Sequence, residues 1–465
     1  MHPWTILAIV ILFMHAVPFL SKQHSEWQEV YVRAAERLLN GGDVYRLQDG
    51  YSYPPFMAWL AIPFTALPPT LSRMLWFSIN VGCLVCMWRL AWCLTDGGHL
   101  EGIHADNIKE HLVCFLGLAC SARYALNGIA HQQADVVIGA LLMFGCWCLS
   151  RNRDLSAAGC FGLAAAMKCT ALLWCPYLLW KRKWKAATWL VVVAFGVNLL
   201  PNLVRAPDRG GSWLAEWLTR YVRPLTAGDH YPGDWGSWII YNQSLSGAGN
   251  RWLTTQWGWR GSEFEVIRRH EAPSPAVVKV IVYGMEIALL IGVAAILIRR
   301  RQKREEPVGW AESSRPTKTK AESVEKVGLE DSAHPTSCHD KPLQIMEYSG
   351  VLLLMVLLSP MSSKPHFSTL VLPGFALARL AVYQGGKILR FLLGLAVVLA
   401  TLSLPLWGGH IDFIALWFGS DTCNALVLLL GALHVLIENN SHAFHHRHGF
   451  DIPLLPCHHG SKQPG

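Results

Sequence analysis

The sequence has few charged residues for its length. Asp, Glu, Lys and Arg make up 15% of its 465 residues, whereas ordinary globular proteins carry about 25%. Apolar residues reach 52%, and they recur along the whole chain in blocks separated by short polar loops. This pattern argues against a set of soluble domains and predicts one all-α domain embedded in a membrane.

Other absences narrow the class of protein. The net charge of +8 does not indicate a nucleic-acid partner, because the basic residues cluster at the ends of apolar blocks, as cytoplasmic membrane anchors do. The 13 cysteines include no CxxC pair in a metal-like setting and lie mostly inside apolar blocks, so no disulfide framework is predicted. The first block, Trp4–Leu20, lacks the basic start and cleavage site of a signal peptide and is expected to stay as a span.

Twelve membrane-spanning segments are predicted from these blocks. An even number places both termini on one side, and the basic clusters put that side in the cytoplasm. The loop 205–273 then lies outside despite its arginines, because loops longer than about 60 residues escape the positive-inside rule. The predicted spans are 4–20, 71–94, 110–124, 134–150, 155–168, 170–180, 186–204, 275–298, 346–359, 366–383, 389–408 and 421–438.

The block Ser156–Trp180 does not fit a single crossing. One helix through it would leave Arg151 and the cluster Lys181–Lys183 on opposite sides of the membrane. Two arms of about 12 residues each rise only about 18 Å, less than the hydrocarbon thickness of about 30 Å. We therefore expect a helical hairpin that turns near Lys168–Thr170, beside a cavity inside the protein, since irregular backbone at membrane depth needs such surroundings.

The polar stretches define the remaining organisation. Residues 29–39 place apolar side chains at helical spacing, which predicts an amphipathic helix on the membrane surface. The turn Asn40–Asp43 ends this helix, with Asp43 interpreted as a turn residue, and a second helix from Tyr53 to Pro69 is too short to cross. The predicted domains are a membrane-embedded core (1–300, with outer loops 21–70 and 205–273, and 343–438), a disordered cytoplasmic linker (301–342) and a His-rich cytoplasmic tail (439–465).

Five segments occur in the order in which a known enzyme family carries them. They are EWQEVYVRAAERLLNGGDVYRLQDGYSYPPF with AIPFTALP, HQQADVVIGALL, GLAAAMKCTALLWCPYLLWKRKWKAA, YNQSLSGAGNRWL and LLSPMSSKPHFSTLVLP. They resemble the first outer loop, the Gly-Gln-x-Asn segment, the Lys-containing hairpin, the Asn-Gln-Ser-Leu loop and the Ser-Pro…His segment of glycosyltransferase family 87. The resemblance covers residues 1–380.

Members of this family are polyprenyl-phosphate-mannose-dependent mannosyltransferases of the membrane-embedded C-type fold. The resemblance implies inverting transfer of a hexose from a polyprenyl phosphate to a hydroxyl of a glycan or glycolipid, at the outer face of the cell membrane and without a cofactor. The chain departs from the family in three places: Glu26 and Glu29 stand where the family has an Asp, Gln132 replaces Gly and Asp135 replaces Asn.

The chemistry calls for a base and for a phosphate site. A carboxylate must take the proton of the acceptor hydroxyl, and cations or hydrogen-bond donors must surround the phosphate. Glu26 and Glu29 follow the first predicted span and so lie at the depth where an acceptor arrives. The alternative is that each is a first-turn acid favoured by the helix dipole. With the resemblance, we expect Glu26 to be the base and keep Glu29 as the alternative.

Two residues are predicted to bind the phosphate. Lys168 lies inside an apolar block, where a charge costs about 2.5–3.5 kcal/mol, and we interpret it as a phosphate-binding cation rather than a side chain that snorkels to the interface. His366 begins a span on the outer side. The resemblance implies a phosphate or sugar contact for it, and a plain interfacial histidine is the alternative.

Five further polar residues are candidates for donor binding. Gln133 and Asp135, at the mouth of a span, either line the cavity or cap the helix. Asn242, Gln243 and Arg251 lie in a loop rich in Trp, which either stacks on sugars or anchors the protein at the membrane interface. No metal is expected, because the histidines of the tail are irregularly spaced and a solvated tail is favoured.

Two rival functions stay open. A transporter or flippase for a lipid-linked sugar would also use intramembrane charge and broken helices, but it has no need of a long first outer loop with acids. A non-catalytic scaffold with the same fold is the other rival. A directly bound nucleotide sugar is not expected, because the sequence shows no Asp-x-Asp motif in a soluble domain.

Overall fold

The computed structural model describes residues 25–46, 50–95, 107–208, 210–226, 231–233, 240–260, 263–305, 341–402 and 409–445, together with Val10, Met14 and Ala16. The predicted first span therefore lies almost wholly outside the described residues, as do most of the predicted linker and the end of the tail. The described part is helical, as predicted, apart from one two-stranded sheet and the connecting turns.

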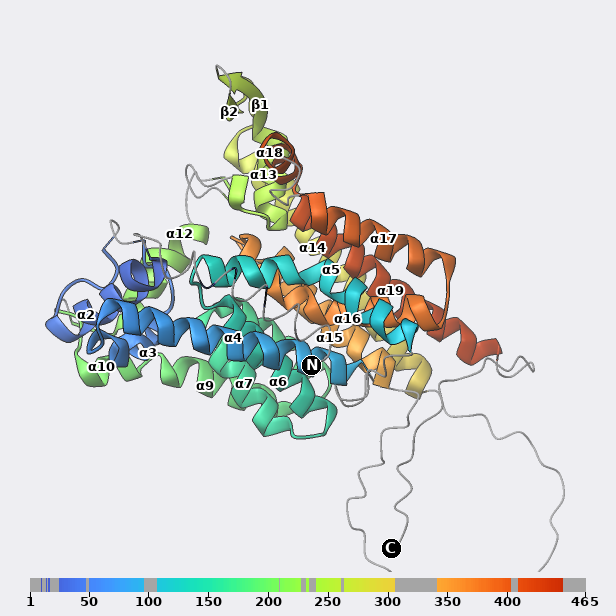
Figure 1. Ribbon diagram of the computed structural model, residues 1–465, viewed down its shortest axis with the longest axis horizontal. Helices are drawn as coiled ribbons and strands as arrows, with labels where there is room; N and C mark the ends of the chain where they lie inside the picture. The colour runs from blue at the N-terminus through green and yellow to red at the C-terminus, as the bar shows by residue number, and fades with distance from the viewer. Residues whose placement is uncertain are drawn as a thin grey trace, which may run out of the picture.

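Six helical segments of the described residues are long and apolar enough to cross a membrane. Several of them, such as α4, α5 and α19, run along the long axis of the molecule (Figure 1). The six are α4 (Pro69–Leu94), α5 (Ile108–Ala130), α9 with α10 (Trp184–Val197 and Leu200–Val204), α14 (Pro275–Glu305), η8 with α16 (Lys364–Leu370 and Val371–Tyr383) and α19 (Ser420–His445).

The twelve expected crossings stay a prediction, because the other expected spans that are described form shorter helices. A helix of 16 residues rises about 24 Å, less than the hydrocarbon thickness of about 30 Å. These shorter helices are α6 (Asp135–Ser150), α7 (Asp154–Met167), η4 with α8 (Cys169–Leu173 and Trp174–Trp180), α15 (Lys341–Leu357) and α17 (Lys387–Leu402).

The predicted hairpin is confirmed. Helix α7 ends at Met167, Lys168 has extended backbone, and η4 and α8 lead the chain back. The start of α7 and the start of α9 lie together, because Lys183 pairs with Asp154 at 2.6 Å. The two basic turns that were predicted to face the cytoplasm are therefore at one end of the protein, and the bend at Lys168 is at the other end of α7.

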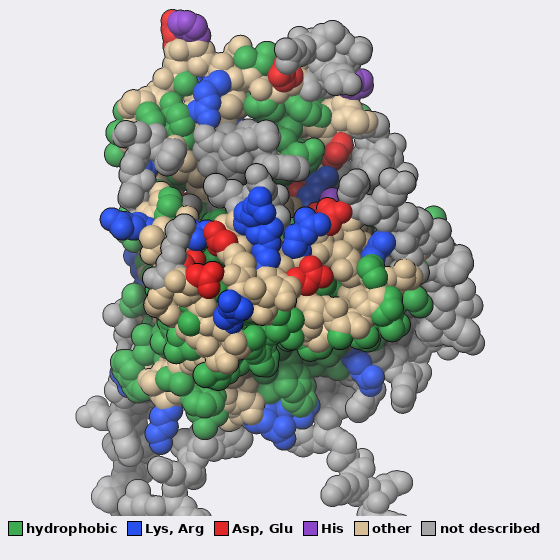
Figure 2. All heavy atoms as spheres, turned by 90° about the vertical axis from the view of Figure 1, so that its left-hand side faces the viewer, with side chains coloured by type: hydrophobic (Ala, Val, Ile, Leu, Met, Phe, Trp, Pro, Cys, Tyr) green, Lys and Arg blue, Asp and Glu red, His purple; other side chains and the backbone are tan. Residues whose placement is uncertain are grey.

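That other end carries short helices. They are η1 (Trp27–Val32), α2 (Arg33–Asn40), α3 (Pro55–Thr65), α11 (Trp213–Trp217), η5 (Leu218–Val222) and α12 (Arg223–Thr226). The amphipathic helix begins as a π-helix, which the residue spacing did not predict, and it ends at Gly41 in the left-handed region, with φ 82°. Asp43 is a turn residue as predicted: its carboxylate accepts the backbone N–H of Tyr45 at 3.0 Å and pairs with Arg220 at 2.8 Å. Figure 2 shows acidic and basic side chains gathered over this end.

The loop 205–273, which was predicted to lie outside, contains more secondary structure than was expected from the sequence. Helix α13 (Leu245–Thr254) leads into an antiparallel hairpin of β1 (Thr255–Arg260) and β2 (Glu263–Arg268), which lies beside α18 (Gly409–Trp417) at the top of Figure 1. The helices next to the predicted linker and tail extend past the predicted boundaries: α14 continues to Glu305, α15 begins at Lys341 and α19 reaches His445. No Gly or Pro follows Gly292 in α14 or Gly431 in α19 to stop either helix earlier.

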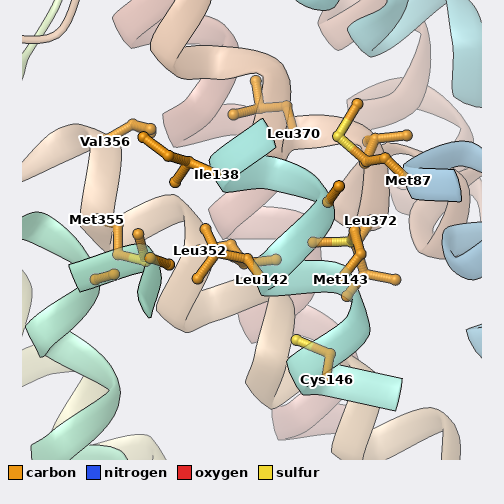
Figure 3. Packing of buried hydrophobic residues seen from close by; sticks show 14 of the residues in the cluster. Met87, Ile138, Leu142, Met143, Cys146, Leu352, Met355, Val356, Leu370 and Leu372 are labelled. Carbon is orange, nitrogen blue, oxygen red and sulfur yellow. The ribbon is translucent and has the colours of Figure 1, made fainter. Parts of the chain in front are cut away.

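The core is centred on α6. Its apolar side chains pack against α4, α15 and the start of α16 (Figure 3). The residues labelled there are Met87, Ile138, Leu142, Met143, Cys146, Leu352, Met355, Val356, Leu370 and Leu372. The eleven described cysteines are free. Helix α7 approaches α9 closely at Gly162, where a Cβ atom would lie 2.8 Å from the carbonyl oxygen of Leu190.

We predict that Gly162→Ala lowers the free energy of unfolding by about 1–3 kcal/mol, because an added methyl group overpacks a backbone contact that cannot yield. The measurement is thermal unfolding of the purified protein in detergent. Gly196→Ala, on α9, is the matched control, since no described heavy atom lies within 4 Å of its Cβ position. Equal stability of the two variants would contradict this packing.

Candidate active site

One pocket is built from segments that are far apart in the sequence. Its cavity volume is about 20 Å³, and it lies where the bend after α7 meets the starts of α6 and η8. Its floor is the apolar core of Figure 3, through Ile138, Leu142, Met355 and Val356. Its polar wall consists of Asp135, Lys168, Thr170, Ser359, Ser362, His366 and Thr369. The pocket thus has a polar wall that suits an anion and an apolar floor.

An ion pair forms the centre of the polar wall. The Lys168 ammonium lies 2.9 Å from Asp135 Oδ1, and the same oxygen lies 3.8 Å from His366 Nε2. The side chains of Lys168 and Asp135 are 17% and 5% exposed, so Lys168 does not snorkel. Asp135 is the first residue of α6, directly after the N-cap residue Ala134. It lines the pocket, which is one of the two positions expected for it.

His366 presents a donor to this cluster. Its Nδ1 accepts the backbone N–H of Ser363 at 3.1 Å, within a capping box at the start of η8. A neutral imidazole whose Nδ1 accepts must carry its proton on Nε2. Nε2 is the atom that faces Asp135, so the wall offers an N–H group beside the Lys168 ammonium. Two hydrogen-bond donors and one carboxylate therefore meet at this point.

Glu26 lies in a second, more exposed cluster. Its Oε2 accepts the side-chain N–H of Gln133 at 3.0 Å, and its Oε1 lies 3.3 Å from His131 Nδ1. The side chain of Glu26 is 42% exposed, which leaves it open to an incoming molecule. Glu29 lies three residues further along the chain, within η1. The structure therefore brings Gln133 to Glu26, as it brings Lys168 and His366 to Asp135.

Aromatic packing holds Glu26 in place. The next residue, Trp27, is fully buried, stacks on Trp76 of α4 at 3.8 Å between ring centroids and donates to Ser72 at 3.0 Å. Trp76 in turn donates to the carbonyl of Gln132 at 2.9 Å. Gln132 has φ 61°, in the left-handed region, and its side chain accepts from the Ser25 hydroxyl. The start of η1 is thereby fixed to the turn between α5 and α6.

The two clusters are neighbours. One turn supplies His131 and Gln133 to Glu26 and then Asp135 to the pocket. Tyr53 lies near both carboxylates: burial raises the pKa of its hydroxyl, and the charges of Asp135 and Glu26 raise it further. The tyrosine is therefore a neutral group near both acids.

Comparison with known proteins gives one match. The family model for glycosyltransferase family 87 matches residues 51–314, more than half of the chain. The chain belongs to glycosyltransferase family 87. This glycosyltransferase is a helical membrane protein by its family and its six candidate spans. No curated protein and no solved structure matches it.

Three predicted donor-binding residues are not in the pocket of this glycosyltransferase. The Asn242 side chain donates to the carbonyl of Pro360 at 2.9 Å and accepts the N–H of Ser362 at 3.0 Å. The Gln243 side chain donates to the carbonyl of Leu416 at 2.8 Å. The segment that carries Ser359 and Ser362 into the pocket wall is thus held by the Asn242 side chain, and the backbone N–H of Gln243 also donates to the carbonyl of Ser362.

Arg251 is fully buried and contacts the backbone. Its Nε donates to the carbonyl of Trp417 at 3.2 Å, and its Nη1 donates to the carbonyl of Asn242. Through Asn242, Arg251 thus supports the segment that contains Ser359 and Ser362. A donor contact by Asn242, Gln243 or Arg251 stays a prediction, and the geometry gives all three a positioning role.

Two residues of the candidate site, His131 and Tyr53, were not predicted from the sequence. His131 stands in a segment that carried the family resemblance, but no pattern distinguishes it from a helix-end histidine. Tyr53 stands beside Pro54 in a segment interpreted as the start of a short helix. Only the packing of the first outer loop onto α4 and the α5–α6 turn shows that both lie at the site.

We predict that Lys168→Gln lowers the free energy of unfolding by about 3–5 kcal/mol, because it leaves the buried Asp135 carboxylate without its cation. Adding Asp135→Asn in the same chain removes the unpaired charge and should restore most of the stability. Thermal unfolding of the single and double variants in detergent measures the difference.

Lys183→Gln is the control for this cycle. It breaks a more exposed pair with Asp154, and a change below about 1 kcal/mol is expected. If the double variant is as unstable as Lys168→Gln alone, then Lys168 does not stabilise the protein through its pair with Asp135.

Proposed function

We propose that this glycosyltransferase moves a hexose, mannose by the resemblance of its motifs, from a polyprenyl phosphate to a hydroxyl of a glycan or glycolipid acceptor. We place the reaction at the outer face of the cell membrane, in a C-type fold with twelve crossings. The observation that carries the proposal is the convergence of Lys168 and His366, nearly 200 positions apart in the chain, on one pocket next to Glu26. No cofactor is needed for this chemistry.

The pocket supports a role in holding the donor phosphate. The Lys168 ammonium and the Nε2–H of His366 are hydrogen-bond donors of the kind that a phosphate oxygen requires. The apolar floor suits the first part of the attached lipid. Charge grows on the phosphate as its bond to the sugar breaks, and fixed donors stabilise that charge.

Glu26 supports the role of base. In the proposed step, its carboxylate takes the proton of the acceptor hydroxyl while that oxygen forms a bond to the sugar C1 and the bond from C1 to the phosphate oxygen breaks. The products are an inverted glycoside and a polyprenyl monophosphate. Gln133 holds Oε2 of the carboxylate, and His131, beside Oε1, is placed to pass the proton to solvent.

We predict that the purified protein transfers mannose from mannosyl-phosphoryl-polyprenol to a glycan or glycolipid acceptor and does not use GDP-mannose. The reason is that the pocket joins its phosphate donors to an apolar floor, where a lipid fits and a nucleoside does not. Product formation from each donor, measured in detergent, makes the comparison.

Two results would contradict the proposed function. Transfer only from GDP-mannose would overturn the donor assignment. Movement of the lipid-linked sugar across proteoliposomes without any glycosidic product would favour the transporter instead.

We predict that Glu26→Gln lowers the rate of transfer by about 10²–10⁴-fold, since the amide cannot accept the proton and general-base catalysis contributes about that factor. Glu36→Gln, which removes an exposed acid from α2, is the control and should stay within a few-fold of the wild type. Initial rates with saturating donor give the comparison. Loss of activity in Glu29→Gln with Glu26→Gln active would move the role of base to Glu29.

A further inference from the structure

The pocket contains a negative charge that a phosphate site has no evident use for. Asp135 is 4% exposed and lines the same wall as Lys168 and His366. Its Oδ1 faces both of them, whereas its buried Oδ2 has no hydrogen-bond partner among the described residues. A carboxylate in this position weakens the binding of every phosphate beside it. The presence of Asp135 in the wall therefore needs an explanation.

The charge balance of the pocket gives one. Lys168 contributes one positive charge and Asp135 one negative charge, while the hydrogen bond from Ser363 to Nδ1 keeps His366 neutral. The summed charge of the three groups is zero. Hydrogen-bond donors are still present, so the wall can bind phosphate oxygens. It has no net positive charge, however, and therefore gives no additional stabilisation to a ligand with a second negative charge.

The substrate and the product of the proposed reaction differ in this respect. A sugar bound through a polyprenyl phosphate is a phosphate diester with one negative charge. The polyprenyl monophosphate left after transfer is a monoester, which carries about 1.5–2 negative charges at pH 7 because its second pKa is about 6. The extra charge of the product would be attracted by Lys168 and repelled by Asp135.

Resting on the proposed function, we propose that Asp135 is a specificity-determining counter-charge that matches the pocket to a singly charged phosphate diester. Because Asp135 repels the second negative charge, the pocket does not bind the polyprenyl monophosphate more tightly than the diester. This favours release of the monophosphate after transfer. The same repulsion acts against free phosphate and other dianions that enter the pocket. Binding of the donor then depends on hydrogen bonds and lipid contacts more than on net charge.

The test compares inhibition by added polyprenyl monophosphate with use of the donor. Initial rates of mannose transfer from mannosyl-phosphoryl-polyprenol give the ratio of the inhibition constant Ki of the monophosphate to the KM of the donor. In Asp135→Asn this ratio should fall about tenfold, the size expected for one charge acting over a few ångströms at a partly shielded site. Asp135→Glu keeps the charge and should keep the ratio.

Two further variants keep the test decisive. Thr170→Lys adds a positive charge at a half-buried position of the same pocket and should also lower the ratio, even if Asp135→Asn does not fold. Asp154→Asn removes an equal charge at the opposite end of α7, where it pairs with Lys183, and should leave the ratio unchanged. Folded Asp135→Asn and Thr170→Lys proteins with a wild-type ratio would overturn the proposal.

The outcomes separate this proposal from the proposed function. If the wild type transfers no sugar from the lipid donor, the proposed function fails. Equilibrium binding of polyprenyl monophosphate and of the lipid diester to wild type and Asp135→Asn then still tests the charge matching. A larger gain in affinity for the monophosphate than for the diester supports it, and an equal gain for both ligands refutes it.

Discussion

The site depends on the neutralisation of Lys168 by Asp135. A lone cation in an apolar block is unfavourable by several kcal/mol, and the ion pair at 2.9 Å is what allows it to stay in the interior. The pair also fixes geometry. It ties the start of α6 to the bend after α7, and His366 joins the same carboxylate oxygen from η8. The polar wall of the pocket follows from that one contact.

Aromatic and amide packing extends this order to Glu26. The stack of Trp27 on Trp76 places Glu26 against the α5–α6 turn, and the same turn continues into Asp135. Asn242 and the backbone of Gln243 hold the segment that carries Ser359 and Ser362. The base candidate and the phosphate candidates are therefore parts of one connected framework, although they come from four separate stretches of the chain.

The sequence was sufficient for features that depend on local pattern. Apolar blocks predicted the helices, and the conflict between the basic clusters around 156–180 predicted the bend at Lys168, which the structure confirms. Glycosyltransferase family membership followed from ordered motifs and is confirmed by the family match. Each of these signals lies within a short stretch or in the order of such stretches, where sequence is informative.

The sequence was insufficient where the meaning of a residue depends on a distant partner. Asn242, Gln243 and Arg251 have the polar character of ligand-binding residues, yet their hydrogen bonds go to the backbone of the pocket segment and of α18. Asp135 could have been a helix cap, and only Lys168, 33 residues later, makes it half of an ion pair. The β1–β2 hairpin is a different case, because its pattern is in the sequence and was missed: Trp257 and Trp259, then Phe264 and Val266, alternate with other residues on the two sides of a Gly-Ser dipeptide.

Asp135 and Lys168 belong to one antiparallel helix pair, and this has a consequence for how the chain enters the membrane. Asp135 opens α6 and Lys168 follows α7, and these helices are consecutive and packed on each other. During synthesis they can leave the translocation channel together, with the charges of Asp135 and Lys168 already compensating each other. His366 is synthesised about 200 residues later, so the pocket is complete only when the second half of the protein has been made. The charge of Lys168, by contrast, is already paired before then.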